Sequence, residues 1–329
     1  LRYASRKIVT VDMLQQHLAI RLKTILDQTT DGYSFSGLSG LENDKSYVFM
    51  SNHRDIALDP AITVLGLVES GRDSLRIAIG DNLLSKPFAS DLMRINRSFI
   101  VKRSVVARRE KLKALKILSN YIRQSVCNEG ISVWIAQAEG RAKDGKDRTE
   151  TALLKMLALS RSKDQDFSSA INELNIVPVS ISYEYDPCDA DKARELYIAK
   201  TGKSYVKTAF EDLETIKKGF IGYKGRVHVH YGSPCKIANI GAENLAADID
   251  DQIFCGYRLF PSNIVAWQML YDSLDVTELK HCWPDEDWFV AHAKFEKRIE
   301  ALPEKHRDIV VQAYASPVTD QLSSSHHRA

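Results

Sequence analysis

A histidine and two nearby carboxylates follow an apolar segment early in the chain. His53 comes shortly after the run 46–50 (SYVFM), and Asp55 and Asp59 follow it at short intervals. Histidine can act as a general base because its pKa lies near the working pH, and a carboxylate on the second ring nitrogen would fix the tautomer. Asp59 precedes Pro60, so we expect it to cap a helix with one oxygen while the other reaches His53. Asp55 is the rival partner, and the plainer interpretation is a turn histidine beside a helix cap.

A second cluster is cationic. Lys102 and Arg103 come directly after the apolar run 98–101 (SFIV). Two cations at the end of a buried strand can hold a phosphate group, and Arg can do so in bidentate fashion. We interpret the cations that follow as a solvated helix face; they are Arg108, Arg109, Lys111, Lys113 and Lys116.

A third cluster joins an acid, a glycine and a base. Glu139, Gly140 and Arg141 follow the apolar run 131–135 (ISVWI). The glycine would allow a ligand to approach the backbone closely. Taken alone, this segment is equally typical of a surface turn held by local ion pairs.

One pair of histidines has no pattern that indicates catalysis. His228 and His230 alternate along an apolar segment and therefore share one face of a strand. No third metal ligand is apparent, so we expect a structural role and no metal site.

Alternating strands and helices must position these clusters. Residues 1–30 contain an amphipathic helix with apolar residues at steps of three and four, residues 31–240 alternate between strands and helices, and residues 241–329 are helical. This pattern predicts an α/β layered domain with a helical C-terminal region. Pro178 lies inside a strand pattern and predicts an edge strand or a bulge. We expect strands over 46–50, 75–79, 98–101, 131–135, 176–181 and 226–230, and helices over 6–27, 59–68, 86–95, 107–125 and 151–159.

Composition excludes several classes of protein. Apolar residues make up 44% and charged residues 27% of the 329 residues, which is typical of a globular protein and not of a disordered chain. The formal net charge of +2 gives no sign of a nucleic-acid partner. Five dispersed cysteines fit a reducing compartment and argue against a disulfide scaffold. No apolar run reaches the roughly 20 residues that a membrane-spanning helix needs.

The order of the clusters resembles the four motif blocks of the glycerophospholipid acyltransferase family. Those blocks correspond to Asn52-His53 with a following Asp, the segment 98–103, the Glu139-Gly140-Arg141 segment, and the segment 176–179 (IVPV). The family includes glycerol-3-phosphate and lysophosphatidic acid acyltransferases, and details after Glu139 are similar to the glycerol-3-phosphate branch. The resemblance implies a layered α/β domain with a mixed sheet flanked by helices.

The resemblance also implies direct acyl transfer from a thioester. His53 would take the proton from the acceptor hydroxyl, and Asp59 would orient the imidazole ring. The donor would be acyl-CoA or acyl-carrier protein, and an acidic carrier would suit the basic run after Arg103. The acceptor would be glycerol 3-phosphate or a lysophospholipid, and the family needs no metal and no cofactor. Arg103 and Arg141 would hold the acceptor phosphate, Lys102 would add positive potential, and Glu139 and Gly140 would shape the site, with a backbone N–H facing the developing oxyanion.

The spacing of the first motif departs from the family pattern. The family has four residues between the histidine and the aspartate, whereas five separate His53 from Asp59. This insertion supports an alternative in which the chain is a non-catalytic relative that binds phospholipid or an acyl carrier. A structure discriminates between the two, because a catalytic pair requires a carboxylate within reach of the His53 ring.

The resemblance further implies contact with a membrane. We expect a cytoplasmic protein that is peripheral on the inner face of the cell membrane. The helix over 6–27, with its apolar stripe and basic flanks, can settle on an anionic lipid surface. The alternative is that this stripe packs on the domain.

Overall fold

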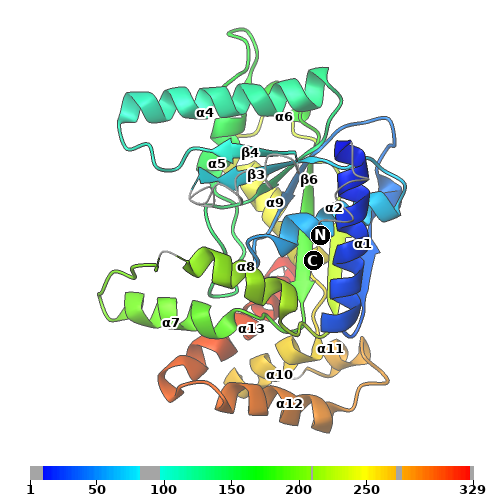
Figure 1. Ribbon diagram of the computed structural model, residues 1–329, viewed down its shortest axis with the longest axis vertical. Helices are drawn as coiled ribbons and strands as arrows, with labels where there is room; N and C mark the ends of the chain where they lie inside the picture. The colour runs from blue at the N-terminus through cyan, green and yellow to red at the C-terminus, as the bar shows by residue number, and fades with distance from the viewer. Residues whose placement is uncertain (1–9, 82–96, 209, 272–275, 327–329) are drawn as a thin grey trace.

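The computed structural model describes residues 10–81, 97–208, 210–271 and 276–326, arranged around a central sheet (Figure 1). Its strands are β1 (Tyr33–Ser36), β2 (Val48–Ser51), β3 (Arg76–Gly80), β4 (Ser98–Val101), β5 (Val133–Ala136), β6 (Ile176–Tyr183) and β7 (Val227–Tyr231). Its helices are α1 (Val11–Thr29), α2 (Leu58–Glu69), α4 (Arg108–Arg123), α5 (Thr151–Leu157), α6 (Phe167–Asn172), α7 (Asp189–Lys200), α8 (Glu211–Ile221), α9 (Ala242–Gly256), α10 (Pro261–Leu270), α11 (Thr277–His281), α12 (Trp288–Glu300) and α13 (Glu304–His326).

The strands form one mixed sheet, as expected from the sequence. Among the described residues the sheet has seven strands in the order β1-β7-β6-β2-β5-β3-β4. From β6 to β4 all neighbours run parallel, whereas β7 is antiparallel to β6 and parallel to β1. The carboxyl ends of parallel strands meet at one edge of a sheet. The segments after β2, β4 and β5, which carry His53, Arg103 and Glu139, therefore lie at the same edge.

Helices cover both faces of this sheet. In β2, Val48 and Met50 pack into one apolar cluster with side chains from α4, α5, α6 and α9. Phe49, between them, packs into a second cluster with side chains from α1 and α2. Every residue of β2 and β6 is buried, because parallel strands covered on both faces have no solvated side.

The C-terminal region is helical, as expected, and packs in two places. From α9, Leu245 and Ile249 join the first apolar cluster of the sheet. The later helices α10, α12 and α13 form a third cluster that includes Ala193 from α7. Figure 1 shows α12 at the end of the molecule opposite α4.

The apolar stripe of α1 packs on the domain. Leu22 and Leu26 are buried in the second cluster, which accounts for the periodicity seen in the sequence. Ile20 lies elsewhere on the helix and is 63% exposed. No helix in the described ranges is both long enough and apolar enough to span a bilayer. The helix expected over 86–95 and the first residues of the helix expected over 6–27 lie outside the described residues.

Pro178 was expected to mark an edge strand or a bulge. The edge strand is wrong, because β6 lies inside the sheet between β7 and β2. The antiparallel ladder with β7 begins at Val179, which pairs with Tyr231. The carbonyl of Pro178 faces the β7 side and accepts a hydrogen bond from Gly232 N, just past the end of β7. The missing N–H of the proline lies on the same side, at the end of the ladder, so the proline removes only the last hydrogen bond between β6 and β7.

Candidate active site

His53 and Asp59 form a hydrogen-bonded pair at the carboxyl end of β2. The distance from His53 Nδ1 to Asp59 Oδ2 is 2.9 Å. The His53 ring also contacts Trp134 edge to face, with 5.8 Å between ring centroids. With Nδ1 directed at the carboxylate, Nε2 is the nitrogen left to receive a proton from a substrate.

Four hydrogen bonds hold the Asp59 carboxylate, which is fully buried. Besides the imidazole, Oδ2 accepts the backbone N–H of Arg54 at 2.6 Å and of Asp55 at 2.8 Å. The other oxygen, Oδ1, accepts the hydroxyl of Tyr183 at 2.8 Å. Burial, with Asp59 beside it, raises the pKa of Tyr183 well above its usual value, so this hydroxyl remains a donor. His53 and Asp59 are therefore hydrogen-bonded even though five residues separate them, because the loop between them directs the N–H groups of Arg54 and Asp55 at the Asp59 carboxylate.

Asp55 has a different role from the one expected of it. Its Oδ1 accepts the N–H groups of Ala57 and Leu58 at 3.0 and 2.7 Å, so it caps α2. Burial raises its pKa, with the nearby Asp59 as a second cause. The expectation that Asp59 is the helix cap is wrong, because α2 begins at Leu58 and Asp59 already lies inside its first turn. Asp55 therefore caps the helix and Asp59 holds the ring.

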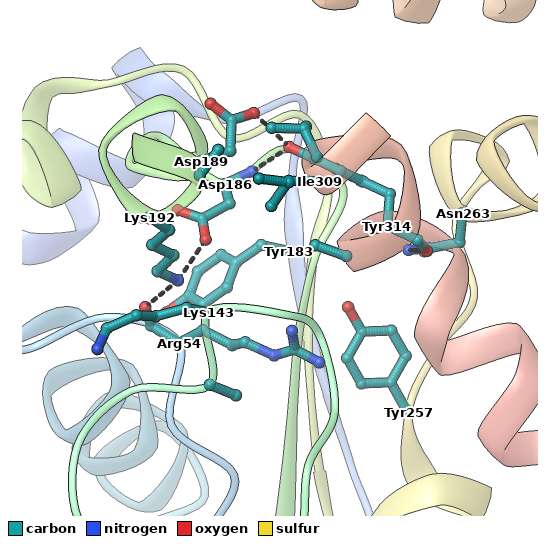
Figure 2. A pocket seen from close by; sticks show the side chains of 14 residues that line it. Arg54, Lys143, Tyr183, Asp186, Asp189, Lys192, Tyr257, Asn263, Ile309 and Tyr314 are labelled. Atoms are coloured by element: carbon teal, nitrogen blue, oxygen red, sulfur yellow. Dashed lines mark hydrogen bonds and ion pairs between the residues drawn. The ribbon is translucent and has the colours of Figure 1, made fainter. Parts of the chain in front are cut away.

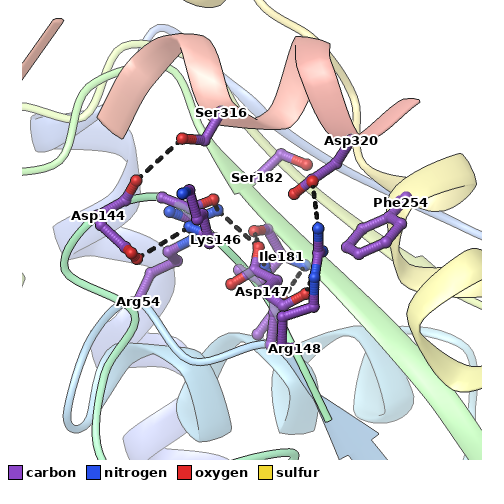
Figure 3. A network of polar contacts seen from close by, with 12 residues as sticks. Arg54, Asp144, Lys146, Asp147, Arg148, Ile181, Ser182, Phe254, Ser316 and Asp320 are labelled. Carbon is purple, nitrogen blue, oxygen red and sulfur yellow. Dashed lines mark hydrogen bonds and ion pairs between the residues drawn. The ribbon is translucent and has the colours of Figure 1, made fainter. Parts of the chain in front are cut away.

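Three residues that sequence reasoning did not single out as a set fix the His53 loop. Asn52 is buried, and its side chain bonds both backbone polar groups of Ile181 on β6. Arg54 points inward, with its guanidinium 5.6 Å from the ring centroid of Tyr257 (Figure 2). Asp147 accepts a hydrogen bond from Asn52 at 3.1 Å. It accepts a second from Arg54 at 2.6 Å, and Figure 3 shows these two residues close together. Buried polar groups need partners, and a buried Asn-Arg-Asp set joins the ends of two strands through such partners.

A cavity of about 290 Å³ opens beside the His53 ring. One part of its wall is polar and contains five of the residues expected at the site, namely Lys102, Arg103, Glu139, Gly140 and Arg141. Another part is apolar and comes mainly from β4, β5, α4 and α5; it includes Val101, Leu115, Leu118, Ile135, Leu153 and Met156. Asp59 does not line the cavity and lies behind the histidine.

The cations of the cavity wall are only partly neutralised. Nη1 of Arg141 is buried without a hydrogen-bond partner among the described residues. The distance from Arg103 Nε to Glu139 Oε1 is 3.9 Å, and the Arg103 side chain is 34% exposed. Lys102 is exposed at the rim. An unpaired buried guanidinium donor is costly and is satisfied when an anion binds.

The loop after β5 is tied to the His53 loop. Ala142 N donates to the carbonyl of His53 at 2.8 Å. Gly140 adopts a φ of 84°, a left-handed conformation that other residues rarely adopt. This glycine allows the chain to turn so that Arg141 faces the cavity while Ala142 reaches back to His53.

Four of the five cations in the basic run on α4 do not line the cavity. Of its five cations, Lys111 lines the cavity wall. All five are exposed, which agrees with the expected solvated helix face; they are Arg108, Arg109, Lys111, Lys113 and Lys116.

The His228 and His230 pair has hydroxyl partners. His228 contacts Ser34 and Ser36 of β1 through its two ring nitrogens at 2.7 and 2.8 Å. His230 contacts Ser36 at 2.8 Å. No group of three or more metal-ligating side chains occurs in the part of the chain that the structure describes. These contacts join β1 to β7, in agreement with the structural role expected.

Comparison with known proteins supplies the family. A family model described as Acyltransferase matches residues 33–182, from the start of β1 almost to the end of β6. All the residues expected at the site lie within this segment. A search of curated proteins finds no match. The mixed sheet, the four motif segments and the matched model agree that residues 33–182 form an acyltransferase domain of the glycerophospholipid acyltransferase family.

Proposed function

We propose that this acyltransferase moves a fatty acyl group from an acyl thioester to the hydroxyl of glycerol 3-phosphate or a lysophospholipid, with His53 as the general base. One observation carries the proposal. The His53 ring, held by a buried carboxylate, borders a cavity whose wall is cationic in one part and apolar in another. An acceptor phosphate and an acyl chain need those two environments on either side of the reacting atoms.

The reaction balances with a single imidazole. His53 Nε2 takes the proton of the acceptor hydroxyl as its oxygen bonds to the thioester carbonyl carbon. The tetrahedral intermediate then expels the thiolate, the C–S bond breaks, and the imidazolium returns the proton to the sulfur. Asp59 keeps the ring oriented and stabilises the imidazolium while it exists. The acyl group reaches the acceptor without an acyl-enzyme intermediate.

The polar part of the wall suits the acceptor phosphate. Arg141 offers an unpaired buried N–H, and Arg103 offers a guanidinium whose contact with Glu139 is long. Lys102 adds positive potential at the rim. Glu139 and Gly140 shape this part of the wall, and we assign the oxyanion to a backbone N–H of the same loop.

The apolar part of the wall suits the acyl chain. Leu118 and Met156 are largely buried and line the cavity beside α4 and α5. Each buried methylene of an acyl chain contributes about 0.8 kcal/mol to binding. Lys111, from the basic run on α4, also lines the cavity. We propose acyl-CoA or acyl-carrier protein as the donor, because both are anionic and would be attracted to this run.

We also propose that the protein works at a membrane surface, because its substrates and products are amphiphiles. Leu22 and Leu26 of α1 are buried in the domain, so the exposed apolar side chains left to this helix are those of Val11, Met13 and Ile20. Contact with lipid would use these residues rather than the whole stripe.

Transfer from a labelled thioester tests the proposal. Purified protein is incubated with labelled palmitoyl-CoA or palmitoyl-carrier protein and with glycerol 3-phosphate, lysophosphatidate, glycerol or monoacylglycerol. We expect labelled product with a phosphorylated acceptor and far less with the matching unphosphorylated one. Binding of thioester without transfer to any acceptor would instead favour a non-catalytic binding protein.

A further inference from the structure

Two successive peptide units after the catalytic histidine are each held at both ends. In the first, the carbonyl of His53 accepts Ala142 N and the N–H of Arg54 donates to Asp59. In the second, the N–H of Asp55 donates to Asp59 at 2.8 Å and the carbonyl of Arg54 accepts Lys192 Nζ at 2.7 Å. Since a peptide unit is planar, a group that fixes its carbonyl also fixes the direction of its N–H. Lys192 therefore sets the direction of a hydrogen bond to the carboxylate that orients His53.

Lys192 comes from outside the segment that the family model matches. It lies on α7 and is 3% exposed. Its ammonium group also bonds the carboxylate of Asp186. A buried ammonium group requires such partners, because an unpaired buried charge is strongly unfavourable. Lys192 is thus fixed in place on one side by Asp186 and on the other by the loop of the active site.

Asp186 is fixed in turn by the C-terminal helices. Its N–H donates to the hydroxyl of Tyr314 on α13 at 2.8 Å, and its carbonyl accepts Nη2 of Arg298 on α12 at 2.7 Å. Burial by itself would raise the pKa of Asp186, but the adjacent Lys192 ammonium, together with the N–H of Cys188 and the charge of Arg141, lowers it. The Asp186 carboxylate is therefore charged and suited to hold the lysine. Figure 2 shows Lys192, Asp186 and Tyr314 in sequence between the Arg54 loop and α13.

We infer that Lys192 is a positioning residue for acyl transfer, and that through it the C-terminal helices hold the peptide units between His53 and Asp59. The inference rests on the proposed function for its kinetic consequence. It makes α7, α12 and α13 a part of the catalytic apparatus, although none of them lies in the family domain.

The first test is hydrogen exchange, which does not depend on activity. Lys192→Met removes the ammonium group and keeps a long unbranched side chain. We expect faster amide exchange in the peptide that covers residues 52–58, measured by mass spectrometry under native conditions. The matched control is Lys218→Met on α8, which breaks an exposed ion pair with Asp191 of α7. This variant should leave the exchange of the peptide 52–58 unchanged.

The second test separates positioning from general stability. Kinetics are measured at a temperature where Lys192→Met and Lys218→Met are fully folded by circular dichroism. There we expect Lys192→Met to lower kcat by about ten- to a hundredfold with little change in the acceptor KM. Tyr314→Phe removes the more distant hydroxyl and should give a smaller loss of the same kind. A purely structural role would lower the melting temperature and leave kcat of the folded protein intact.

The outcomes are distinct. Unchanged exchange over residues 52–58 in Lys192→Met overturns the inference, whatever the activity of the protein. The inference is also overturned if folded Lys192→Met keeps the wild-type kcat, or if its loss of kcat is no larger than that of Lys218→Met. If the wild-type protein transfers no acyl group, the proposed function fails, and the exchange experiment still decides whether Lys192 holds the loop.

Discussion

His53 and His228 are both largely buried histidines with polar partners, yet the two surroundings give the imidazole ring different chemistry. His53 has a carboxylate on Nδ1 and a cavity beside its ring. His228 lies on β7 and has a serine hydroxyl of β1 at each ring nitrogen. A carboxylate stabilises a protonated ring and a free nitrogen can exchange a proton with substrate, whereas two hydroxyl partners leave no nitrogen for a substrate. Partner and access, and not burial alone, therefore distinguish the histidine that we propose as the general base from the one that joins two strands.

The largest expected effect follows from removing the two rings in turn. His53→Ala should lower kcat by about 10⁴-fold, the upper end of what a general base contributes, with the fold retained. His228→Ala is the matched control and should keep the wild-type kcat at a temperature where it is folded. Steady-state kinetics with a labelled thioester measure both. Equal kcat values for the two variants would remove the distinction between the two histidines.

The next effect concerns the carboxylate that the structural histidine lacks. Asp59→Asn should lower kcat by about a hundredfold or more, because an amide no longer fixes the ring tautomer or stabilises the imidazolium. Tyr183→Phe removes one donor to Asp59 and leaves the charge, so its loss of kcat should be much smaller. If Asp59→Asn kept the wild-type kcat, the pair seen in the structure would have no catalytic meaning.

A smaller effect is expected in the cavity wall beside His53. Arg141→Ala should raise the acceptor KM by about ten- to a hundredfold, the value of one hydrogen bond to a charged group. Arg103→Ala should raise it less, because that side chain is one-third exposed. Arg161→Ala removes the same charge from a turn outside the cavity and serves as the control. An unchanged KM in both cavity variants would exclude them from the phosphate site.

The smallest effect is on stability and belongs to His228. Burial, followed by nearby Arg258 and His230, lowers the pKa of His228 to about 4 from 6.5. Between these values the unfolded chain binds more protons than the folded one, so the free energy of unfolding falls as pH falls from 6.5 to 4. His228→Gln should reduce that fall by on the order of 1–2 kcal/mol after allowance for partial solvation, as measured by urea unfolding at a series of pH values. An identical pH dependence in the variant would contradict this assignment.

Much of the sheet could be predicted because its central strands β2 and β6 are buried on both faces and the other strands contain short apolar runs. The apolar runs that become β2, β3, β4, β5, β6 and β7 are visible in the sequence, and the polar residues that follow three of them meet at one edge. Strand β1 was not predicted. Its four residues, Tyr33–Ser36, alternate as a strand should, but the run is very short, and the His228 partner of its serines is 192 or more positions away.

Local rules failed where a long-range contact replaced a local one. Pro178 predicts an edge strand, but the neighbouring strand ends where its N–H would be needed. Asp59 before Pro60 predicts a helix cap, but Asp55 takes that role and releases Asp59 for the ring. Asp147 and Lys192 contact the His53 loop from 93 and 138 positions away, and their sequence neighbourhoods contain no sign of this.

The fate of a labelled acyl group in a single turnover tests the central claim most directly, that His53 activates the acceptor rather than carrying the acyl group. Excess wild-type protein is mixed with labelled acyl thioester, with and without a phosphorylated acceptor, and quenched at short times. We predict that the label passes from thioester to acceptor in the presence of acceptor, that it stays on the thioester in its absence, and that no labelled protein forms at any time. Labelled protein that accumulates without acceptor and then decays into product would contradict the account.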